Sequence, residues 1–317
     1  MNKEAFWKNK IVVVVGALVC CLLWGSAFPC VKIGKNLFGV DSSDVPSIIL
    51  FAGARFTLAG LLILMIGSIG EKKILLPQKR NWKDVFVLAI FQTWLQYIFY
   101  YIGLANTPGV TAAIINGLNV FLTILVSCFI FRQEKFTLKL LVGCVLGFGG
   151  ILVLQANNFT ASAVHFSIIG EGFLMISALA SAFASGFIKE YSKEESPVVL
   201  SGWQFFIGGA ILVLGGLLFG GKLTVTSVFA VPMLFYLAFI SAVAFSLWGI
   251  LLKYNDVSTV SAFKTMNPVF GVLLSAAFLP EERGSITYFT CIALLLVLVG
   301  IYIINTRKRK KKTPPES

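Results

Sequence analysis

Residues 11–33 read IVVVVGALVCCLLWGSAFPCVKI, a run of 23 residues in which Lys32 is the only charged side chain. About 20 such residues cross the roughly 30 Å of a bilayer's hydrocarbon as an α-helix. Lipid offers no partner for backbone groups, so a stretch of this kind must be helical. Nine similar stretches follow, at residues 46–69, 85–104, 111–131, 138–155, 168–188, 198–219, 228–252, 258–279 and 286–304. The sequence predicts an all-α integral membrane protein with ten transmembrane helices.

The composition supports this class. Of the 317 residues, 57% are hydrophobic and 13% are charged, whereas a soluble domain carries about 25% charged residues. An ordinary soluble enzyme, a disordered chain and a disulfide scaffold are therefore excluded. The six cysteines lie in or beside apolar runs, and none has a metal-ligand spacing. We expect no metal and no cofactor.

The net charge of +12 is concentrated in short segments between the apolar runs and in the tail 306–317. The tail contains RKRKKK at residues 307–312, a pattern typical of a cytoplasmic terminus beside anionic lipid rather than of nucleic-acid binding. With the N-terminus inside, twenty Lys and Arg residues fall in inner segments and four in outer ones. This asymmetry predicts that both termini are cytoplasmic and that the number of spans is even.

The two halves of the chain resemble each other. At an offset of 149 residues Gly60 falls on Gly209, and Arg55-Phe56 falls on Gln204-Phe205. At an offset of 148 residues further identities are Thr111/Thr259, Asn119/Asn267, Leu125/Leu273, Ser127/Ser275 and Glu134/Glu282. Five spans per half is an odd number, so the second repeat enters the membrane upside down. We predict one repeat at 11–155, an inverted repeat at 168–305 and a basic cytoplasmic tail at 306–317; inverted repeats are typical of secondary transporters.

Four motifs in this order suggest a family. They are WGSAFP at 24–29, RF at 55–56, GLANTP at 103–108, and MNPVF at 266–270 with Glu281-Glu282 beyond it. Over nearly the whole chain, as two tandem units, the pattern resembles the EamA type of the drug/metabolite transporter superfamily. The sequence departs at Asn119-Val120, where many members have a proline, as helix 9 does here at Pro268. A matched pair of proline kinks is therefore not expected.

The resemblance implies a carrier of amino acids, amines or similar small metabolites in the bacterial inner membrane, often an exporter. It also implies a cavity lined by helices 1, 3, 4, 6, 8 and 9. Helices 5 and 10 would lie outside this cavity, where they could serve a homodimer. The GxxxG formed by Gly143 and Gly147 in helix 5 could equally pack within one molecule.

Arg55 lies near the centre of its predicted span. An arginine at that depth costs about 2.5–3.5 kcal/mol on insertion scales, and such a residue usually faces the bundle interior. Two interpretations remain open: an anchor for a substrate carboxylate or gating ion pair, or a cap on the carbonyls of a neighbouring helix.

A polar pair with a spacing of three residues recurs in both repeats, Asn116 with Asn119 and Lys264 with Asn267. Residues three apart share one helix face, so we expect these side chains to line a common cavity. The alternatives are hydrogen bonds between helices and, for Lys264, a side chain extended to the cytoplasmic surface.

Helix 3 carries Gln92, Gln96 and Tyr97, which we expect to line the cavity together with Trp24 and Trp248. Aromatic walls with a few amides suit an amphipathic metabolite. Gly25, Pro29 and Pro268 interrupt predicted helices, and we interpret them as gates or hinges. Close packing of small residues is the alternative for Gly25 and Pro29.

The acidic residues considered next are expected at the ends of helices. Glu171 is expected to be a solvated residue at a helix N-terminus, with a proton-coupling carboxylate as the alternative. Glu134, Glu281 and Glu282 end their spans, and we expect them to form ion pairs at the surface or at a gate.

The sequence as a whole predicts a secondary transporter that moves a small molecule across the bilayer by alternating access. No catalytic constellation is present outside the spans, so an enzyme is not expected. A non-transporting sensor or channel-like scaffold and an intramembrane enzyme are the alternatives. Coupling to a proton stays open. The positive residues within spans favour an anionic substrate, whereas the aromatic residues favour a neutral or cationic one.

Overall fold

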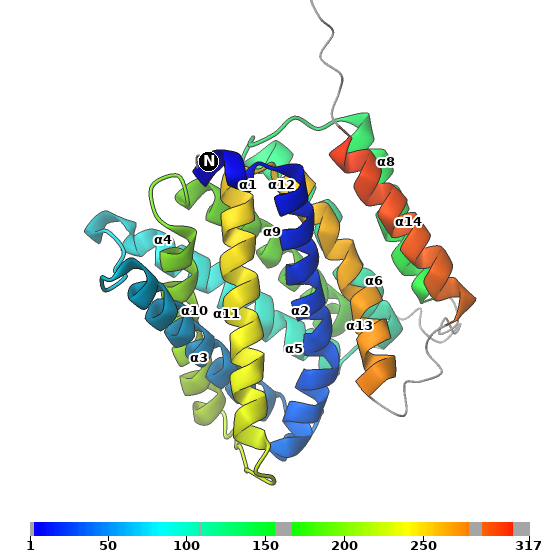
Figure 1. Cartoon of the computed structure of the whole chain (residues 1–317). Helices are drawn as coiled ribbons and strands as arrows, with labels where there is room; N and C mark the ends of the chain where they lie inside the picture. Colours follow the sequence, from blue (N-terminus) through cyan, green and yellow to red (C-terminus); the bar gives the residue numbers. More distant parts are fainter. Residues whose placement is uncertain (1–2, 108, 156–166, 279–286, 307–317) are drawn as a thin grey trace, which may run out of the picture.

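The computed structural model describes residues 3–107, 109–155, 167–278 and 287–306. Within these ranges the regular structure is helical throughout, and each of the ten predicted stretches coincides with a helix or with consecutive helices (Figure 1). The helices, with η marking 3₁₀ and π segments, are α1 (Lys3–Trp7), α2 (Lys10–Leu37), α3 (Val45–Glu71), η1 (Lys79–Asn81), α4 (Trp82–Leu88), η2 (Ala89–Leu95), α5 (Gln96–Ala105), α6 (Gly109–Gly117), α7 (Asn119–Leu125), η3 (Val126–Ile130), α8 (Leu138–Leu154), η6 (Ile168–Gly172), α9 (Phe173–Tyr191), α10 (Pro197–Leu218), α11 (Ala230–Tyr254), α12 (Val257–Ser261), η7 (Ala262–Thr265), α13 (Met266–Phe278) and α14 (Tyr288–Asn305).

Eight helices in the described ranges are long and apolar enough to cross a membrane. Two predicted spans differ from these eight. Helix α8 has 17 residues, and the ninth predicted span is divided into α12, η7 and α13. The all-helical membrane architecture is confirmed, whereas the count of ten crossings stays a prediction. Of the predicted tail, 306–317, only Thr306 belongs to the described residues.

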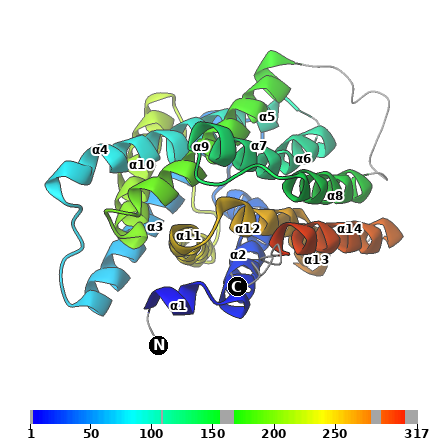
Figure 2. The same cartoon turned by 90° about the horizontal axis from the view of Figure 1, so that it is seen from above.

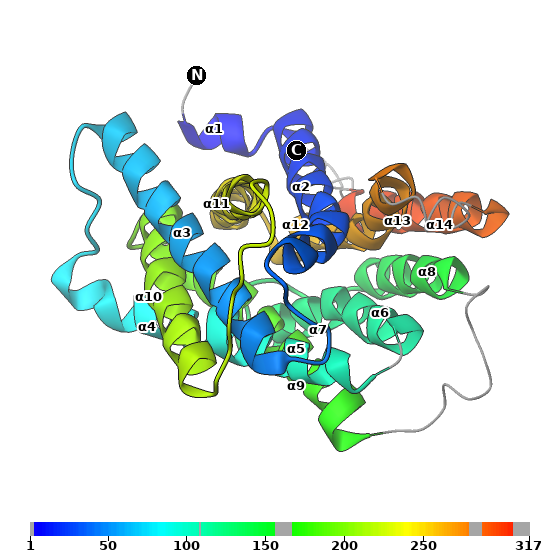
Figure 3. The same ribbon diagram turned by 90° about the horizontal axis from the view of Figure 1, so that it is seen from below.

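The helices form two layers (Figures 2 and 3). Helices α9, α7, α6 and α8 follow one side, and α11, α2, α13 and α14 follow the other. Helices α3 and α10 pack together at one end, and α8 packs against α14 at the opposite end. Each of these pairs joins corresponding helices of the two halves. The packing therefore has the approximate twofold symmetry that inverted repeats produce.

Glycines at the crossing of α3 and α10 reveal this symmetry residue by residue. A Cβ on Gly60 would lie 2.3 Å from the Phe206 nitrogen, and one on Gly209 would lie 2.3 Å from the Thr57 nitrogen. Thr57 and Phe206 are themselves 149 positions apart. The two backbones thus approach through the same contact made twice, once from each half. The predicted repeat at this offset is confirmed.

Both halves also interrupt a helix at equivalent places. Helix α6 ends at Gly117 and α7 begins at Asn119, while η7 precedes the start of α13 at Met266. The intervening Leu118 lies 148 positions before Met266. The first half is interrupted without a proline, so the two halves share the break although only the second half has a proline beside it. Pro268 lies in the first turn of α13, where its missing N–H leaves no helical bond unmade.

The small residues of α8 serve packing inside the molecule. A Cβ on Gly143 would lie 2.8 Å from the Gly300 carbonyl oxygen of α14, and one on Gly150 would lie 2.9 Å from that of Ala293. The close approach of these backbones fixes α8 and α14 as a pair at one end of the two layers (Figure 1). A homodimer formed through these helices stays a prediction.

Candidate functional site

Arg55 lies inside the bundle and contacts helix α11. Its Nε donates to the Leu237 carbonyl oxygen at 3.2 Å and to the Ser241 Oγ at 2.9 Å. The side chain is 6% exposed, and its guanidinium carbon lies 5.3 Å from the centre of the Phe56 ring. None of the ion pairs among the described residues includes Arg55. Its charge is therefore stabilised by dipoles and a ring rather than by a carboxylate.

The repeat partner of Arg55, Gln204, makes the equivalent contact in the other half. The Gln204 Oε1 accepts from the Thr93 Oγ1 at 2.8 Å, and its Nε2 donates to the Gln92 Oε1 at 3.3 Å. Thr93 and Ser241 are 148 positions apart. Equivalent positions thus make an interhelical hydrogen bond to a hydroxyl in both halves, but the Arg55 Nε donates to Ser241 and the Gln204 Oε1 accepts from Thr93. The Arg55 Nε caps a carbonyl of the neighbouring helix, as the second interpretation of this residue predicts. A contact between its terminal nitrogens and the substrate stays a prediction.

Lys264 and Asn119 bring the predicted polar pairs of the two repeats together. The Lys264 Nζ lies 3.5 Å from the Asn119 Oδ1, a long hydrogen bond, and 5.5 Å from the centre of the Trp248 ring. The Asn119 Nδ2 donates to the Ala178 carbonyl oxygen of α9 at 3.0 Å. Lys264 therefore contacts residues of both repeats at the interrupted part of its helix, and its predicted extension to the cytoplasmic surface is not seen.

Several polar atoms near Lys264 are buried without a hydrogen-bond partner among the described residues. They are the indole nitrogens of Trp24 and Trp248 and the Oδ1 of Asn267. The two indole rings are 5.0 Å apart. An unpaired buried polar group costs about 1–3 kcal/mol, so native interiors rarely tolerate several together. Their concentration beside a cation that forms no ion pair with a described carboxylate makes this cluster the candidate binding site.

An aromatic row connects the surroundings of Lys264 with those of Arg55. Successive ring centres lie 4.4–5.3 Å apart, in the order Trp248, Trp24, Phe245, Phe205, Phe56 and Tyr97. These residues come from α11, α2, α10, α3 and α5, so both repeats contribute. Tyr97, a predicted lining residue, stands at the Arg55 end of this row.

The remaining predicted lining residues are less central. The Gln92 amide oxygen accepts a hydrogen bond from Gln204. The backbone carbonyl oxygen of Gln96 accepts from the Ser177 Oγ at 2.7 Å. The Gln96 side chain is half-buried, and Asn116 is exposed on α6. The structure thus joins Lys264, Asn119, Asn267, Trp24 and Trp248 in one cluster and leaves Asn116 outside it.

The predicted hinge residues of helix 1 lie in a continuous helix, because α2 extends unbroken through Pro29. A Cβ on Gly25 would lie 2.5 Å from the Phe270 Cβ, and one on Gly271 would lie 3.0 Å from the Phe28 Cδ2. Helices α2 and α13 therefore cross in close contact, as the packing interpretation of Gly25 requires. Hinge motion at Gly25, Pro29 and Pro268 stays a prediction.

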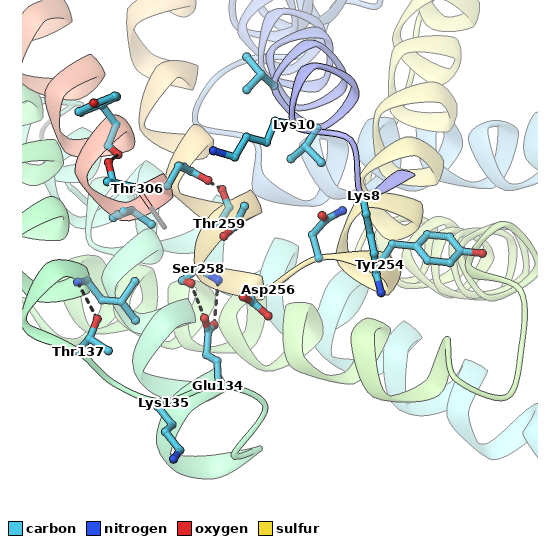
Figure 4. Close-up of a pocket in the computed structure, with 17 residues that line it drawn as sticks. Lys8, Lys10, Glu134, Lys135, Thr137, Tyr254, Asp256, Ser258, Thr259 and Thr306 are labelled. Atoms are coloured by element: carbon cyan, nitrogen blue, oxygen red, sulfur yellow. Dashed lines mark hydrogen bonds between the residues drawn. The ribbon is translucent and has the colours of Figure 1, made fainter. Parts of the chain in front are cut away.

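Glu134 joins the two halves at the end of the molecule where α12 begins (Figure 4). Its Oε1 accepts from the Ser258 backbone nitrogen at 2.9 Å and from the Ser127 Oγ at 3.0 Å, and its Oε2 accepts from the Ser258 Oγ. Ser258 lies in the first turn of α12, where the helix dipole favours a carboxylate. The expected ion pair is wrong for Glu134, because its partners among the described residues are the Ser258 N–H and the hydroxyls of Ser127 and Ser258 rather than a cation. Glu281 and Glu282 lie outside the described residues.

A pocket of about 930 Å³ opens beside this contact. It lies between the ends of α2, α8, α12 and α14, and Lys8, Lys10 and Lys135 line it together with Glu134 and Asp256 (Figure 4). Sequence reasoning missed this pocket, because its walls come from four segments that are distant in the chain.

Glu171 is buried rather than solvated, so that expectation is also corrected. It is 5% exposed, and its Oε2 accepts from the Ser167 nitrogen at 2.8 Å, while the Ser167 Oγ accepts from the Gly170 nitrogen. These reciprocal bonds satisfy N–H groups at the start of η6. The carboxylate caps the start of this helix, so the predicted position of Glu171 at a helix N-terminus is correct.

The fold and this interior cluster define a class: a multi-pass helical membrane protein built of two inverted repeats with polar residues between them. A model of the EamA-like transporter family matches residues 11–155 and 168–306, so the chain belongs to the EamA-like transporter family. The resemblance seen in the sequence is confirmed. The family implies a transporter with a small-molecule substrate and a membrane environment.

Related proteins support this assignment over most of the chain. The uncharacterized transporter YvbV of Bacillus subtilis strain 168 is 25% identical over 309 residues, 96% of this chain and 94% of that protein. The WAT1-related protein At3g02690, chloroplastic, of Arabidopsis thaliana is 24% identical, over 89% of this chain and 66% of its own length. A solved crystal structure with 18% identity has the same fold, with a TM-score of 0.77 over 94% of this chain and 97% of that one.

Proposed function

We propose that this protein carries a small metabolite out of a bacterial cytoplasm by alternating access, as a secondary transporter of the inner membrane with both termini inside. The main observation behind the proposal is the contact between Lys264 and Asn119. They come from opposite repeats and lie at the equivalent interruptions of their helices. Transporters of inverted repeats bind substrate at such places, near the middle of the membrane.

The arrangement of the two layers supports alternating access. In this conformation Glu134 of the first repeat binds Ser258 of the second, so the halves are fastened at the end where α12 begins. An access change requires such a contact to form and break as one layer rocks against the other. The approximate twofold symmetry provides an equivalent conformation in which the opposite end is fastened.

Residues with unused bonding capacity are the ones we assign to the substrate. These are the terminal nitrogens of Arg55, the Lys264 ammonium, the Asn267 amide oxygen, and the indoles of Trp24 and Trp248, with Tyr97 as apolar wall. Gln92 and Asn119 hold their neighbours in place, whereas Gln96 and Asn116 receive no contact with the substrate in this assignment. Gly25, Pro29 and Pro268 are assigned to the gate.

A comparison of growth media tests transport even though the substrate is not identified. The wild type and Arg55→Gln are overexpressed at matched membrane levels, and the media are analysed by untargeted mass spectrometry. A compound enriched with the wild type and not with the variant is the expected result. Identical media with both proteins, in rich and minimal medium alike, would contradict export and favour the non-transporting scaffold. Lys222→Gln, a change of an exposed cation outside the site, should export like the wild type.

A further inference from the structure

We infer that the substrate is an amphipathic organic anion, with its carboxylate at Lys264 and its ring-bearing body along Trp24, Trp248 and Phe245. This inference rests on the proposed transport function and names the substrate class of that same site. Three independent features lead to it: the balance of charge in the bundle, the kind of polar atom left unpaired, and the length of the apolar wall.

The charged side chains between the two layers are positive. Arg55 and Lys264 lie between the layers, and neither forms an ion pair with a described carboxylate. Two acids that belong to the described spans or their ends, Glu134 and Glu171, already accept from backbone N–H groups. Buried charges are normally paired, so the anion that balances these cations comes from a ligand. A cationic substrate would instead add a third positive charge to the same interior.

The unpaired polar atoms next to Lys264 are mainly donors. The Trp24 and Trp248 indole nitrogens each carry an N–H, and neither has an acceptor among the described residues. The Lys264 Nζ lies 5.5 Å from the Trp248 ring and offers further N–H donors. Donors and a positive charge within one cluster suit carboxylate oxygens, because charge-assisted hydrogen bonds are the strong ones.

The apolar wall is longer than a carboxylate. Ser241, beside Arg55, and Trp248, beside Lys264, are seven residues apart on α11, which corresponds to a rise of about 10 Å. Trp24 and Phe245, both half-buried, cover this interval. A small inorganic anion would leave the wall unused, whereas a ring system of comparable length would stack along it.

Three probes with the same ring test the inference on the wild-type protein. They are 2-naphthoate, 2-naphthamide and 2-naphthylmethylamine, titrated by calorimetry into the purified full-length chain in lipid nanodiscs, with acetate and chloride for comparison. We expect 2-naphthoate to bind about ten- to hundredfold more tightly than the amide, and the amine, acetate and chloride to bind more weakly than 2-naphthoate. Equal or tighter binding of the amide or amine overturns the inference. So does chloride or acetate binding as tightly as 2-naphthoate, which would indicate a site for small anions only, or a failure of 2-naphthoate to bind.

Variants then assign the preference to Lys264. Lys264→Gln should bind the acid and the amide alike, Lys264→Arg should keep the preference, and Lys222→Gln should behave as the wild type. Should Lys264→Gln not fold, Trp24→Phe replaces it, because that change removes the N–H and retains an aromatic ring. An undiminished preference in the folded variant overturns the inference. Binding is measured without transport, so a wrong substrate class leaves the growth-medium result intact, whereas failure of transport leaves the binding preference intact.

Discussion

Arg55 has two roles, one in packing and one as a positive charge. Its Nε donates to a hydroxyl of α11, where Gln204 at the equivalent position accepts from a hydroxyl of η2, and its charge has no counterpart in the other half. An amide is therefore sufficient for the packing role, and the arginine is needed for the charge. The equivalence of positions 55 and 204 could be predicted from the sequence. Their partners Ser241 and Thr93 could not, since these depend on which helices are neighbours.

Gln204→Ala should lower the free energy of unfolding by about 1–3 kcal/mol, because the fully buried Thr93 hydroxyl loses its acceptor. Arg55→Gln should unfold close to the wild type, since glutamine can make the bond that it makes at position 204. Thermal unfolding of the purified proteins measures both. Gln96→Ala is the matched control, and an equal loss of stability there would contradict this account of Gln204.

Two kinds of element contact hold the halves together. At α3 and α10 the glycines allow the backbones to touch, and at α12 the Glu134 carboxylate caps a helix of the other repeat. The first kind was visible as Gly60 and Gly209 at matching positions. The second was mistaken for an ion pair, because a carboxylate at the end of a span has the same sequence pattern whether it meets a lysine or a helix N-terminus.

Gly60→Ala and Gly209→Ala should each destabilise the protein by about 1–3 kcal/mol, the usual cost of overpacking. The added methyl would lie 2.3 Å from a backbone nitrogen in both variants. Gly215→Ala on α10 has no atom within 4 Å of the new methyl, so its stability should be unchanged or slightly higher. The midpoint of thermal unfolding separates the two classes. Equal midpoints for all three would contradict the close crossing.

Glu134→Ala should loosen the end of the bundle where α12 begins. Removal of the carboxylate leaves the Ser258 nitrogen and hydroxyl without their shared acceptor. In a background where Cys21 is the only cysteine, we expect faster maleimide labelling of this buried thiol. Glu190→Ala removes an exposed ion pair with Lys193, which contributes little, and should leave the rate unchanged. A rate as slow as that of the parent in Glu134→Ala would exclude a fastening role.

The whole molecule follows from the repeat and from the pattern of apolar runs. Both could be predicted from the sequence, because the length of an apolar run and the offset between matched residues can be counted along the chain without knowing which helices are neighbours. The interior site was only partly readable. Lys264 and Asn119 were chosen for their spacing, but the unpaired indoles and the row from Trp248 to Tyr97 exist only once the layers face each other.

The orientation of the whole molecule is checked with topology reporters. A reporter fused after Lys312 should be cytoplasmic, and one inserted after Lys222, between α10 and α11, should be periplasmic, as the excess of inner Lys and Arg requires. Alkaline phosphatase and fluorescent-protein fusions give opposite signals at the two sites. The same compartment for both would contradict the inverted arrangement of the second repeat.

The crossing of α3 and α10 has a consequence for the origin of the chain. A patch that touches its own equivalent, as Gly60 with Phe206 and Gly209 with Thr57 do, is the hallmark of an isologous dimer interface. One half of this chain could thus have paired with an antiparallel copy of itself before the two were joined. Two copies of one half must carry the same residue at the position of Arg55, whereas a joined chain can carry arginine once and glutamine once. Fusion therefore gave the molecule the freedom to place a single positive charge on one side of its symmetry axis.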